Sequence, residues 1–149
     1  MYEIRHARES DAEALRDLYL SHLTQNPPAE PKPLGEFAGR LVELSQVPGY
    51  HILVGEADGR VVSSVTLVIV KNLTHNLRPY AVIENVVTHA DFRGNGYASA
   101  LMDRAGEIAR KHGCYKIMLM TGSKKDSTLG FYENCGYNRN DKTAFIKWL

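Results

Sequence analysis

The sequence predicts an α+β domain with three α/β/α layers around a mixed, mostly antiparallel central sheet. Three observations carry this prediction. Helical and strand-like hydrophobic periods alternate along the chain, a hairpin signal joins two early strands, and a strand–helix–strand unit follows later. The 149 residues suit one hydrophobic core, and no linker divides them, so we expect a single domain over 1–149.

The N-terminal part is predicted to contain one strand and two helices. Residues 2–8 alternate weakly, and Ser10 to Glu13 have the pattern of a capping box that opens a helix running to about residue 24. The proline-rich residues 26–33 exclude helix and central strand, because proline lacks the N–H and has a fixed φ. A second helix follows and ends at Pro48-Gly49.

The middle of the chain is predicted to supply three strands. Residues 50–57 and 60–70 are rich in β-formers and are joined by Asp58-Gly59, a strong hairpin signal. After a polar loop over 71–79, residues 80–88 form the next strand. This segment therefore makes the antiparallel half of the sheet.

The remaining residues are predicted to add a parallel strand and two helices. Residues 94–98 open a long helix that closes near Gly113, and the nearly all-apolar residues 114–121 indicate a strand covered on both faces. A short helix over 127–135 follows. Residues 137–149 leave room for closing strands.

Composition narrows the class of protein. A formal net charge of +1 argues against nucleic acid or an anionic membrane as a partner. No apolar run approaches the roughly 18 residues that cross a bilayer, and residues 1–6 are too polar for a signal peptide. The two cysteines form no Cys-x-x-Cys pair, which favours a reducing compartment. We therefore expect a cytoplasmic protein.

The strongest local signal is the segment Arg93 to Ser99, which lies between a strand and a helix. Its two glycines allow φ > 0 and bring backbone N–H groups close to a ligand at the positive end of the next helix. The segment is therefore a candidate anion-binding turn. A glycine-rich turn without a ligand is the alternative that the residues leave open.

Two nucleotide-binding motifs are excluded by the same residues. A Walker loop needs Gly-Lys-Ser/Thr, but Gly96 is followed by Tyr97-Ala98. A dinucleotide fingerprint needs a third glycine where this chain has Ser99, and an acidic residue after the next strand, where residues 116–120 have none.

Two motifs of the sequence resemble those of a known family. Arg93-x-x-Gly96-x-Ala98 is similar to the Q/R-x-x-G-x-G/A turn of the GNAT superfamily of N-acetyltransferases, and residues 129–137 are similar to that family's second signature, a short helix with an aromatic pair and a terminal Gly-aromatic. The resemblance implies the acyl-CoA N-acyltransferase fold and acetyl-CoA as co-substrate. It covers the whole chain in element order, with its motifs between about residues 82 and 137.

Three stretches are similar to glucosamine-6-phosphate N-acetyltransferases: residues 83–87, 113–117 and 131–137. The N-terminal half and the 71–79 loop are not, so the motifs do not identify the acceptor. We expect a small-molecule primary amine. The alternatives are acetylation of a protein or peptide amine and a non-catalytic acyl-CoA-binding regulatory module. The sequence leaves open whether the chain forms a homodimer.

The resemblance implies a cofactor site on matching positions. The pantetheine arm would pair with the backbone of Val86, Val87 and Thr88 as if it were an added strand. The pyrophosphate would be held mainly by main-chain N–H groups of the turn, which consists of Arg93, Gly94, Asn95, Gly96, Tyr97, Ala98 and Ser99.

Two residues are candidates for proton transfer. Tyr132 matches the family's tyrosine beside the cofactor sulfur and is the candidate acid, the alternative being a packed core tyrosine. Glu84 is the candidate base, because a carboxylate within an apolar strand is unusual. Strict alternation along the strand places Glu84 on one face with Val82 and Val86. The alternative to a catalytic base is a glutamate with a purely structural role. His89 is a second candidate for the base. The histidines lack metal-ligand spacing, so no metal is expected.

Overall fold

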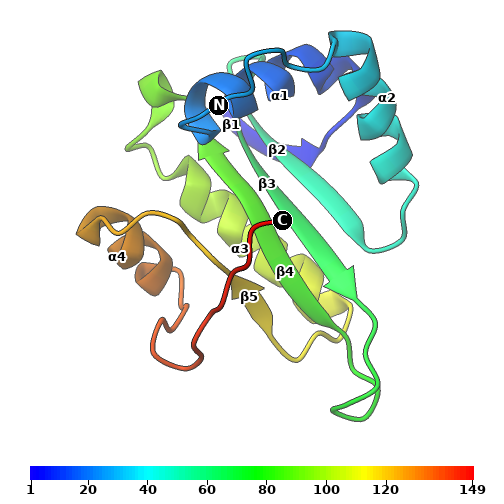
Figure 1. Ribbon diagram of the computed structural model, residues 1–149, viewed down its shortest axis with the longest axis vertical. Helices are drawn as coiled ribbons and strands as arrows, with labels where there is room; N and C mark the ends of the chain where they lie inside the picture. Colours follow the sequence, from blue (N-terminus) through cyan, green and yellow to red (C-terminus); the bar gives the residue numbers. More distant parts are fainter.

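The computed structural model describes residues 1–149 and contains a five-stranded sheet (Figure 1). Its strands are β1 (Tyr2–His6), β2 (Tyr50–Ala57), β3 (Arg60–Val70), β4 (Tyr80–Thr88) and β5 (Ile117–Leu119). Their spatial order equals their chain order. The first three pairs are antiparallel and β4–β5 is parallel, which confirms the predicted mixed, mostly antiparallel sheet.

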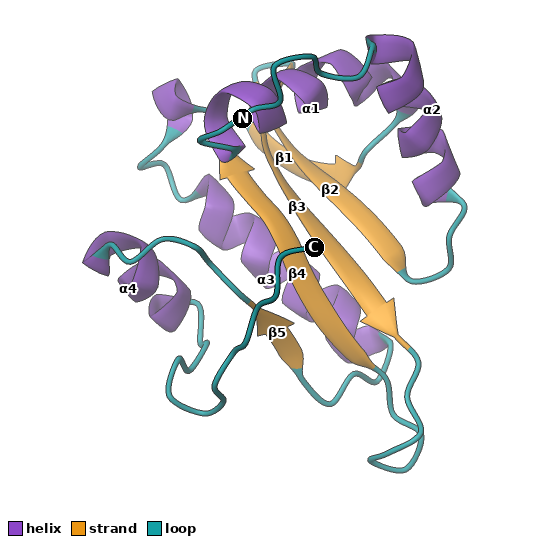
Figure 2. Ribbon diagram, viewed as in Figure 1, coloured by secondary structure: helices purple, strands orange, loops and turns teal.

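Helices cover both faces of the sheet (Figure 2). The long ones are α1 (Ala12–Leu18), α2 (Leu34–Ser45), α3 (Tyr97–Lys111) and α4 (Asp126–Asn134), and the short segments are η1 (Glu9–Asp11), η2 (Tyr19–Leu23) and η3 (Ala90–Phe92). The neighbours Leu53 and Val54 show the layering: Leu53 belongs to the core under α3, whereas Val54 belongs to the core under α1 and α2. No helix is both long and apolar enough to cross a membrane.

The segment that leads into α1 differs from the predicted capping box. Asp11 takes the role predicted for Glu13, but at the start of η1: its carboxylate accepts a hydrogen bond from the Arg8 N–H at 2.7 Å. The same carboxylate accepts two further bonds from the Arg5 guanidinium, at 2.8 and 2.9 Å. A local pattern could not reveal this arrangement, because Arg5 comes from β1 and fixes Asp11 only when the strand and the helix pack together.

The hairpin between β2 and β3 forms where it was predicted. Asp58 has φ 51° and Gly59 has φ 78°, which are the two left-handed residues of a type I′ turn. This turn matches the right-handed twist of the flanking strands and sets the register of the first pairs, Ala57 with Arg60 and Glu56 with Val61. A bulge at Gly55/Glu56 then shifts the register along the rest of the hairpin.

The C-terminal part of the sheet is smaller than predicted. β5 covers Ile117–Leu119 rather than 114–121, and Met118 and Met120 are exposed. The expectation of a strand covered on both faces was wrong, because α3 packs on one face of β5 and no element of this chain buries the other. Residues 137–149 form no strand.

A cluster of three histidines, from β1, β2 and the residue after α3, predicts a pH-dependent stability. His6 Nε2 and His51 Nδ1 are 3.0 Å apart, and the His112 ring lies 5.6 Å from the His51 ring. Burial, followed by the charges of His6 and His112, lowers the pKa of His51. Protonation of His51 therefore favours the unfolded chain, so stability should be full above about pH 6.5 and fall as the pH drops below it.

We expect the melting temperature to fall between pH 7.5 and 5.5, and His51→Gln to lose part of that slope. Thermal unfolding of both proteins across this range is the measurement. Parallel curves for the two proteins would show that His51 does not contribute to the pH dependence.

Candidate active site

The site begins where β4 and β5 separate. β5 pairs only with residues 81–83 of β4, so beyond Ile83 the β5-facing edge of β4 is open. The His89 N–H donates to the Val62 carbonyl at 2.8 Å. In an antiparallel pair, the backbone groups of successive residues point alternately toward the neighbouring strand and away from it. Since His89 bonds to β3, Val87 does so too, whereas the backbone groups of Val86 and Thr88 face the open edge. The Thr88 carbonyl, however, accepts a hydrogen bond from Arg93 Nε at 3.2 Å. The backbone groups of Val86 and the Thr88 N–H are therefore the groups that are free to pair.

A β-bulge at Asn85 corrects the predicted alternation along β4. Thr66 pairs with Glu84 but Ser64 pairs with Val87, and Asn85 has a left-handed φ of 54°. The extra residue shifts the side-chain period. Glu84 thus lies on the face of α1 and α2, whereas Val86 packs against the core under α3. The prediction that these two share a face was wrong.

The turn before α3 has the geometry of an anion site. Gly94 has φ 80° and Gly96, the residue before the helix, has φ 76°. No backbone N–H from 94 to 99 donates to a protein acceptor, since the first intrahelical bond runs from Ala100 N to Gly96 O. These free donors point from the positive end of a 15-residue helix, where an anion is stabilised.

A cavity of about 360 Å³ joins this turn to the open edge of β4. It is lined by His22, Val86, Val87, Thr88, Phe92, Arg93, Gly94, Gly96, Tyr97, Ala98, Ser99, Phe131 and Tyr132. The lining includes every predicted cofactor-binding residue except Asn95, whose side-chain amide donates to the Phe92 carbonyl at 2.9 Å. The structure therefore brings both predicted parts of the cofactor site into one cavity.

Arg93 holds the turn in place through its side chain. Its Nε donates to the Thr88 carbonyl at 3.2 Å, and a terminal nitrogen lies 3.5 Å from the His22 carbonyl. The guanidinium therefore ties the turn to the end of β4 and to η2. Thr88 also carries a buried hydroxyl without a partner in the protein.

Tyr132 reaches the cavity from α4. The side chain is half-buried and its hydroxyl makes no hydrogen bond within the protein. Burial, with a smaller contribution from Cys135, raises the pKa of Tyr132 above its usual value. The phenol therefore stays protonated at neutral pH and has a proton to donate.

Glu84 lies outside this cavity. It is exposed, forms no ion pair, and is paired in the sheet with Thr66, which lines a second cavity of about 90 Å³ under α1 and α2. Asn85 lines that second cavity too. The two candidate proton-transfer residues therefore lie in different parts of the site, Tyr132 in the large cavity and Glu84 on the face of α1 and α2.

His22 lines the cavity although no sequence pattern indicated it. It comes from η2, and its Nδ1 accepts a hydrogen bond from the Ala90 N–H at 3.3 Å. The His22 and His89 rings lie 4.1 Å apart. His89 itself does not line the cavity, and its Nδ1 accepts from the Asp91 N–H at 3.1 Å. Only packing of η2 onto the end of β4 places His22 here.

Residues 12–137 match the sequence model of the acetyltransferase (GNAT) family. The chain belongs to this family. GNAT membership accounts for the arrangement described above, in which a diverging strand pair and a glycine turn meet at one cavity. It also confirms the resemblance predicted from the motifs at residues 93–98 and 129–137.

Similar proteins support the same assignment. A glucosamine 6-phosphate N-acetyltransferase of Trypanosoma brucei brucei is 33% identical over 140 residues, which are 94% of this chain and 91% of that one. Glucosamine 6-phosphate N-acetyltransferase 1 of Oryza sativa subsp. japonica is 30% identical over 122 residues, 80% of this chain and 72% of that one. A putative acetyltransferase of Agrobacterium tumefaciens superimposes with a TM-score of 0.87 at 37% identity, covering 98% of this chain and 99% of that one.

This GNAT protein is thus an enzyme of the acetyl-CoA-dependent N-acetyltransferase class, with the fold of that family.

Proposed function

We propose that this GNAT enzyme transfers the acetyl group of acetyl-CoA directly to the primary amine of a small molecule in the cytoplasm. One observation carries the proposal: a single cavity joins the free N–H groups of the 93–99 turn, the open edge of β4 and the unbonded hydroxyl of Tyr132. These are an anion site, a site for an amide-containing arm and a proton donor, which are the three features that acetyl transfer from this thioester needs.

The residues present fit acetyl-CoA. The N–H groups of residues 94–99 take the pyrophosphate, and the backbone groups of Val86 and the Thr88 N–H pair with the pantetheine arm. The arm then runs along β4 toward the point where β5 leaves it. This places the thioester near the cavity wall that Tyr132 forms.

Tyr132 acts as the acid. As the amine nitrogen bonds to the acetyl carbon and the carbon–sulfur bond breaks, the Tyr132 hydroxyl gives its proton to the departing sulfur. Glu84 takes the proton that the amine loses, directly or through water. Its position on the face of α1 and α2 means that the acceptor approaches from that face.

An amino sugar phosphate is the first acceptor to test, because the relatives from Trypanosoma and Oryza are named for glucosamine 6-phosphate. The decisive experiment measures CoA release with acetyl-CoA and three acceptors: glucosamine 6-phosphate, glucosamine, and a lysine-containing peptide. We expect turnover with a sugar amine. Turnover with the peptide alone would move the function to protein acetylation, and acetyl-CoA binding without any turnover would indicate a non-catalytic module.

Glu84→Gln tests the base. Glutamine keeps the shape of the side chain but cannot accept a proton, so kcat should fall by about 10²–10⁴ at neutral pH and recover partly at high pH, where the amine deprotonates by itself. Steady-state rates across pH 6–10 are the measurement, once the acceptor is known.

Glu107→Gln is the matched control, because Glu107 is another exposed glutamate and lies on α3. It should keep the wild-type pH–rate profile. If Glu84→Gln keeps the acidic limb of that profile, Glu84 is not the base and the role passes to His89 or to water.

A further inference from the structure

His22 is held at the wall of the large cavity by three contacts and keeps one polar atom without a partner. Its Nδ1 accepts the Ala90 N–H at 3.3 Å, a terminal nitrogen of Arg93 lies 3.5 Å from its carbonyl oxygen, and its ring lies 4.1 Å from the His89 ring. Figure 1 shows η2, in blue, beside the arrowhead of β4. The His22 Nε2 makes no hydrogen bond within the protein and is not buried, so it is free to meet a ligand.

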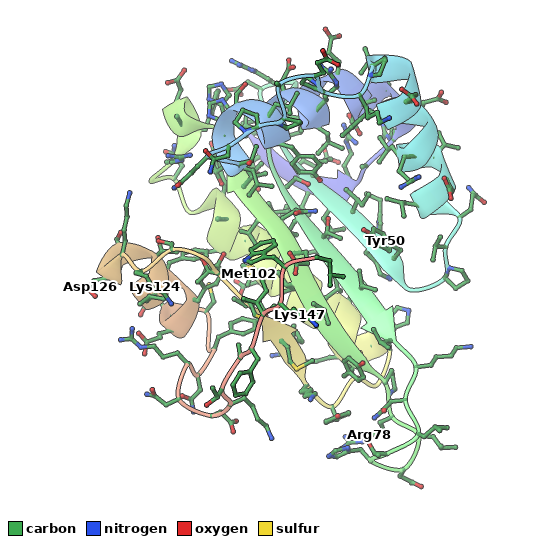
Figure 3. All side chains as sticks on the ribbon, in the orientation of Figure 1. Tyr50, Arg78, Met102, Lys124, Asp126 and Lys147 are labelled. Carbon is green, nitrogen blue, oxygen red and sulfur yellow. The ribbon has the colours of Figure 1, made fainter.

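The backbone of η2 explains why His22 points to the cavity. η2 is a π-helical turn, in which the Thr24 N–H donates to the Tyr19 carbonyl at 3.1 Å. Tyr19 packs its ring against Phe37 of α2 and lines the second cavity together with Tyr50, which Figure 3 labels. In an α-helix, residues three apart share a face, but the extra residue of a π turn rotates the side chains that follow. Tyr19 therefore anchors the turn in the core while His22 reaches the other cavity.

The His22 ring presents a hydrogen-bond donor at neutral pH. Burial, followed by the charges of His89 and Arg93, lowers the pKa of His22 below its ordinary value, so the ring is neutral. A neutral imidazole carries one N–H, and Nδ1 is the acceptor for Ala90. The hydrogen is therefore on Nε2, the nitrogen without a partner.

The surroundings of His22 favour an anionic ligand. The charged groups that face its ring are Arg93, Arg60 and Asp91, with His89 adding a charge when it is protonated. Arg60 is held there because a terminal nitrogen lies 3.3 Å from His89 Nε2. The Asp91 side chain is 82% exposed, so water screens its charge. Positive charge thus predominates on this side of the cavity.

We propose that His22 is a further cofactor-binding residue, whose Nε2–H donates a hydrogen bond to a diphosphate oxygen of acetyl-CoA. The proposal rests on the proposed function, because it takes acetyl-CoA as the occupant of the cavity. Residues 94–99 offer their N–H groups to the same diphosphate, and His22 adds a donor from the N-terminal half of the chain. A hydrogen bond to an ionised acceptor is about twice as strong as one between neutral groups.

Two substitutions separate this hydrogen bond from a purely structural role. The side-chain oxygen of asparagine lies near the position of a histidine Nδ1, so His22→Asn still accepts from Ala90 but has no donor at Nε2. The side-chain nitrogen of glutamine lies near the position of Nε2, so His22→Gln keeps the donor and loses the acceptor for Ala90. Each variant is therefore the matched control of the other.

Calorimetry should show that His22→Asn binds acetyl-CoA about 10- to 100-fold more weakly than the wild type, which is the loss of one hydrogen bond to a charged group. His22→Gln should bind with near wild-type affinity, and both variants should keep the wild-type circular dichroism spectrum. An equal loss in both variants, or a loss in His22→Gln alone, would show that His22 only fastens η2 to β4 and would overturn the proposal.

S-acetylpantetheine tests the assignment to the diphosphate. This compound has the same arm and thioester but no diphosphate, so His22→Asn and the wild type should bind it equally. A loss of the same size as with acetyl-CoA would place the contact on the arm and overturn the assignment. If the wild type binds acetyl-CoA and His22→Asn binds it equally well, the role of His22 alone fails. If the wild type does not bind acetyl-CoA, the proposed function fails with it.

Discussion

Replacing Gly96 with valine should weaken acetyl-CoA binding by about 10- to 100-fold while leaving the fold intact. Gly96 has φ 76°, and a side chain there strains the backbone even though no atom lies within 4 Å of its would-be Cβ. The valine variant relaxes out of this conformation, and the N–H groups of the turn no longer converge on the pyrophosphate. Binding must then restore the strain, at a cost of about 1–3 kcal/mol.

Gly113 supplies a matched control at the other end of α3. It has φ 74° and no atom within 4 Å of its would-be Cβ, so Gly113→Val introduces the same backbone strain. It does not line the cavity. Calorimetry should therefore show weak acetyl-CoA binding by Gly96→Val and near wild-type binding by Gly113→Val. Equal affinities for Gly96→Val and the wild type would refute the placement of the pyrophosphate.

Tyr132→Phe should lower kcat by about 10²–10⁴ and change the affinity for acetyl-CoA little. Phenylalanine keeps the ring that packs against the core under α3 and removes only the hydroxyl. Because burial raises the pKa of Tyr132, the hydroxyl is protonated throughout the neutral range, and the loss should be nearly constant between pH 6 and 9. Steady-state kinetics with the acceptor that the CoA-release experiment identifies are the measurement.

Tyr137→Phe controls for loss of a half-buried phenol. Burial raises the pKa of Tyr137 to about 12, and this residue packs against the same core without lining the cavity. Its removal should leave kcat near the wild-type value. If Tyr132→Phe also turns over at the wild-type rate, the sulfur leaves unaided or takes its proton from another donor.

Several parts of the fold and site were predictable because their causes are local. Asp58-Gly59 forms the type I′ hairpin since both residues tolerate positive φ. Gly94 and Gly96 have the left-handed conformations that the turn requires, and the strand before the turn and the helix after it lie where hydrophobic periodicity predicted them. Proximity in sequence was enough to specify the backbone geometry of this turn.

Pairing between distant segments decided the features that the sequence did not reveal. The bulge at Asn85 depends on the register of β4 against β3, and it moves Glu84 to a different face from Val86. His22 reaches the cavity only because η2 packs against the end of β4.

By itself, then, the sequence determined the family, the order of nearly all elements and the N–H turn, since each follows from short-range backbone preferences and a hydrophobic period. Tertiary structure alone decided which face of β4 carries Glu84 and where β5 ends. It also decided that residues 138–149 find no burial within their own chain. The physical reason is that strand register and burial are set by contacts between residues far apart in the chain, which no local pattern encodes.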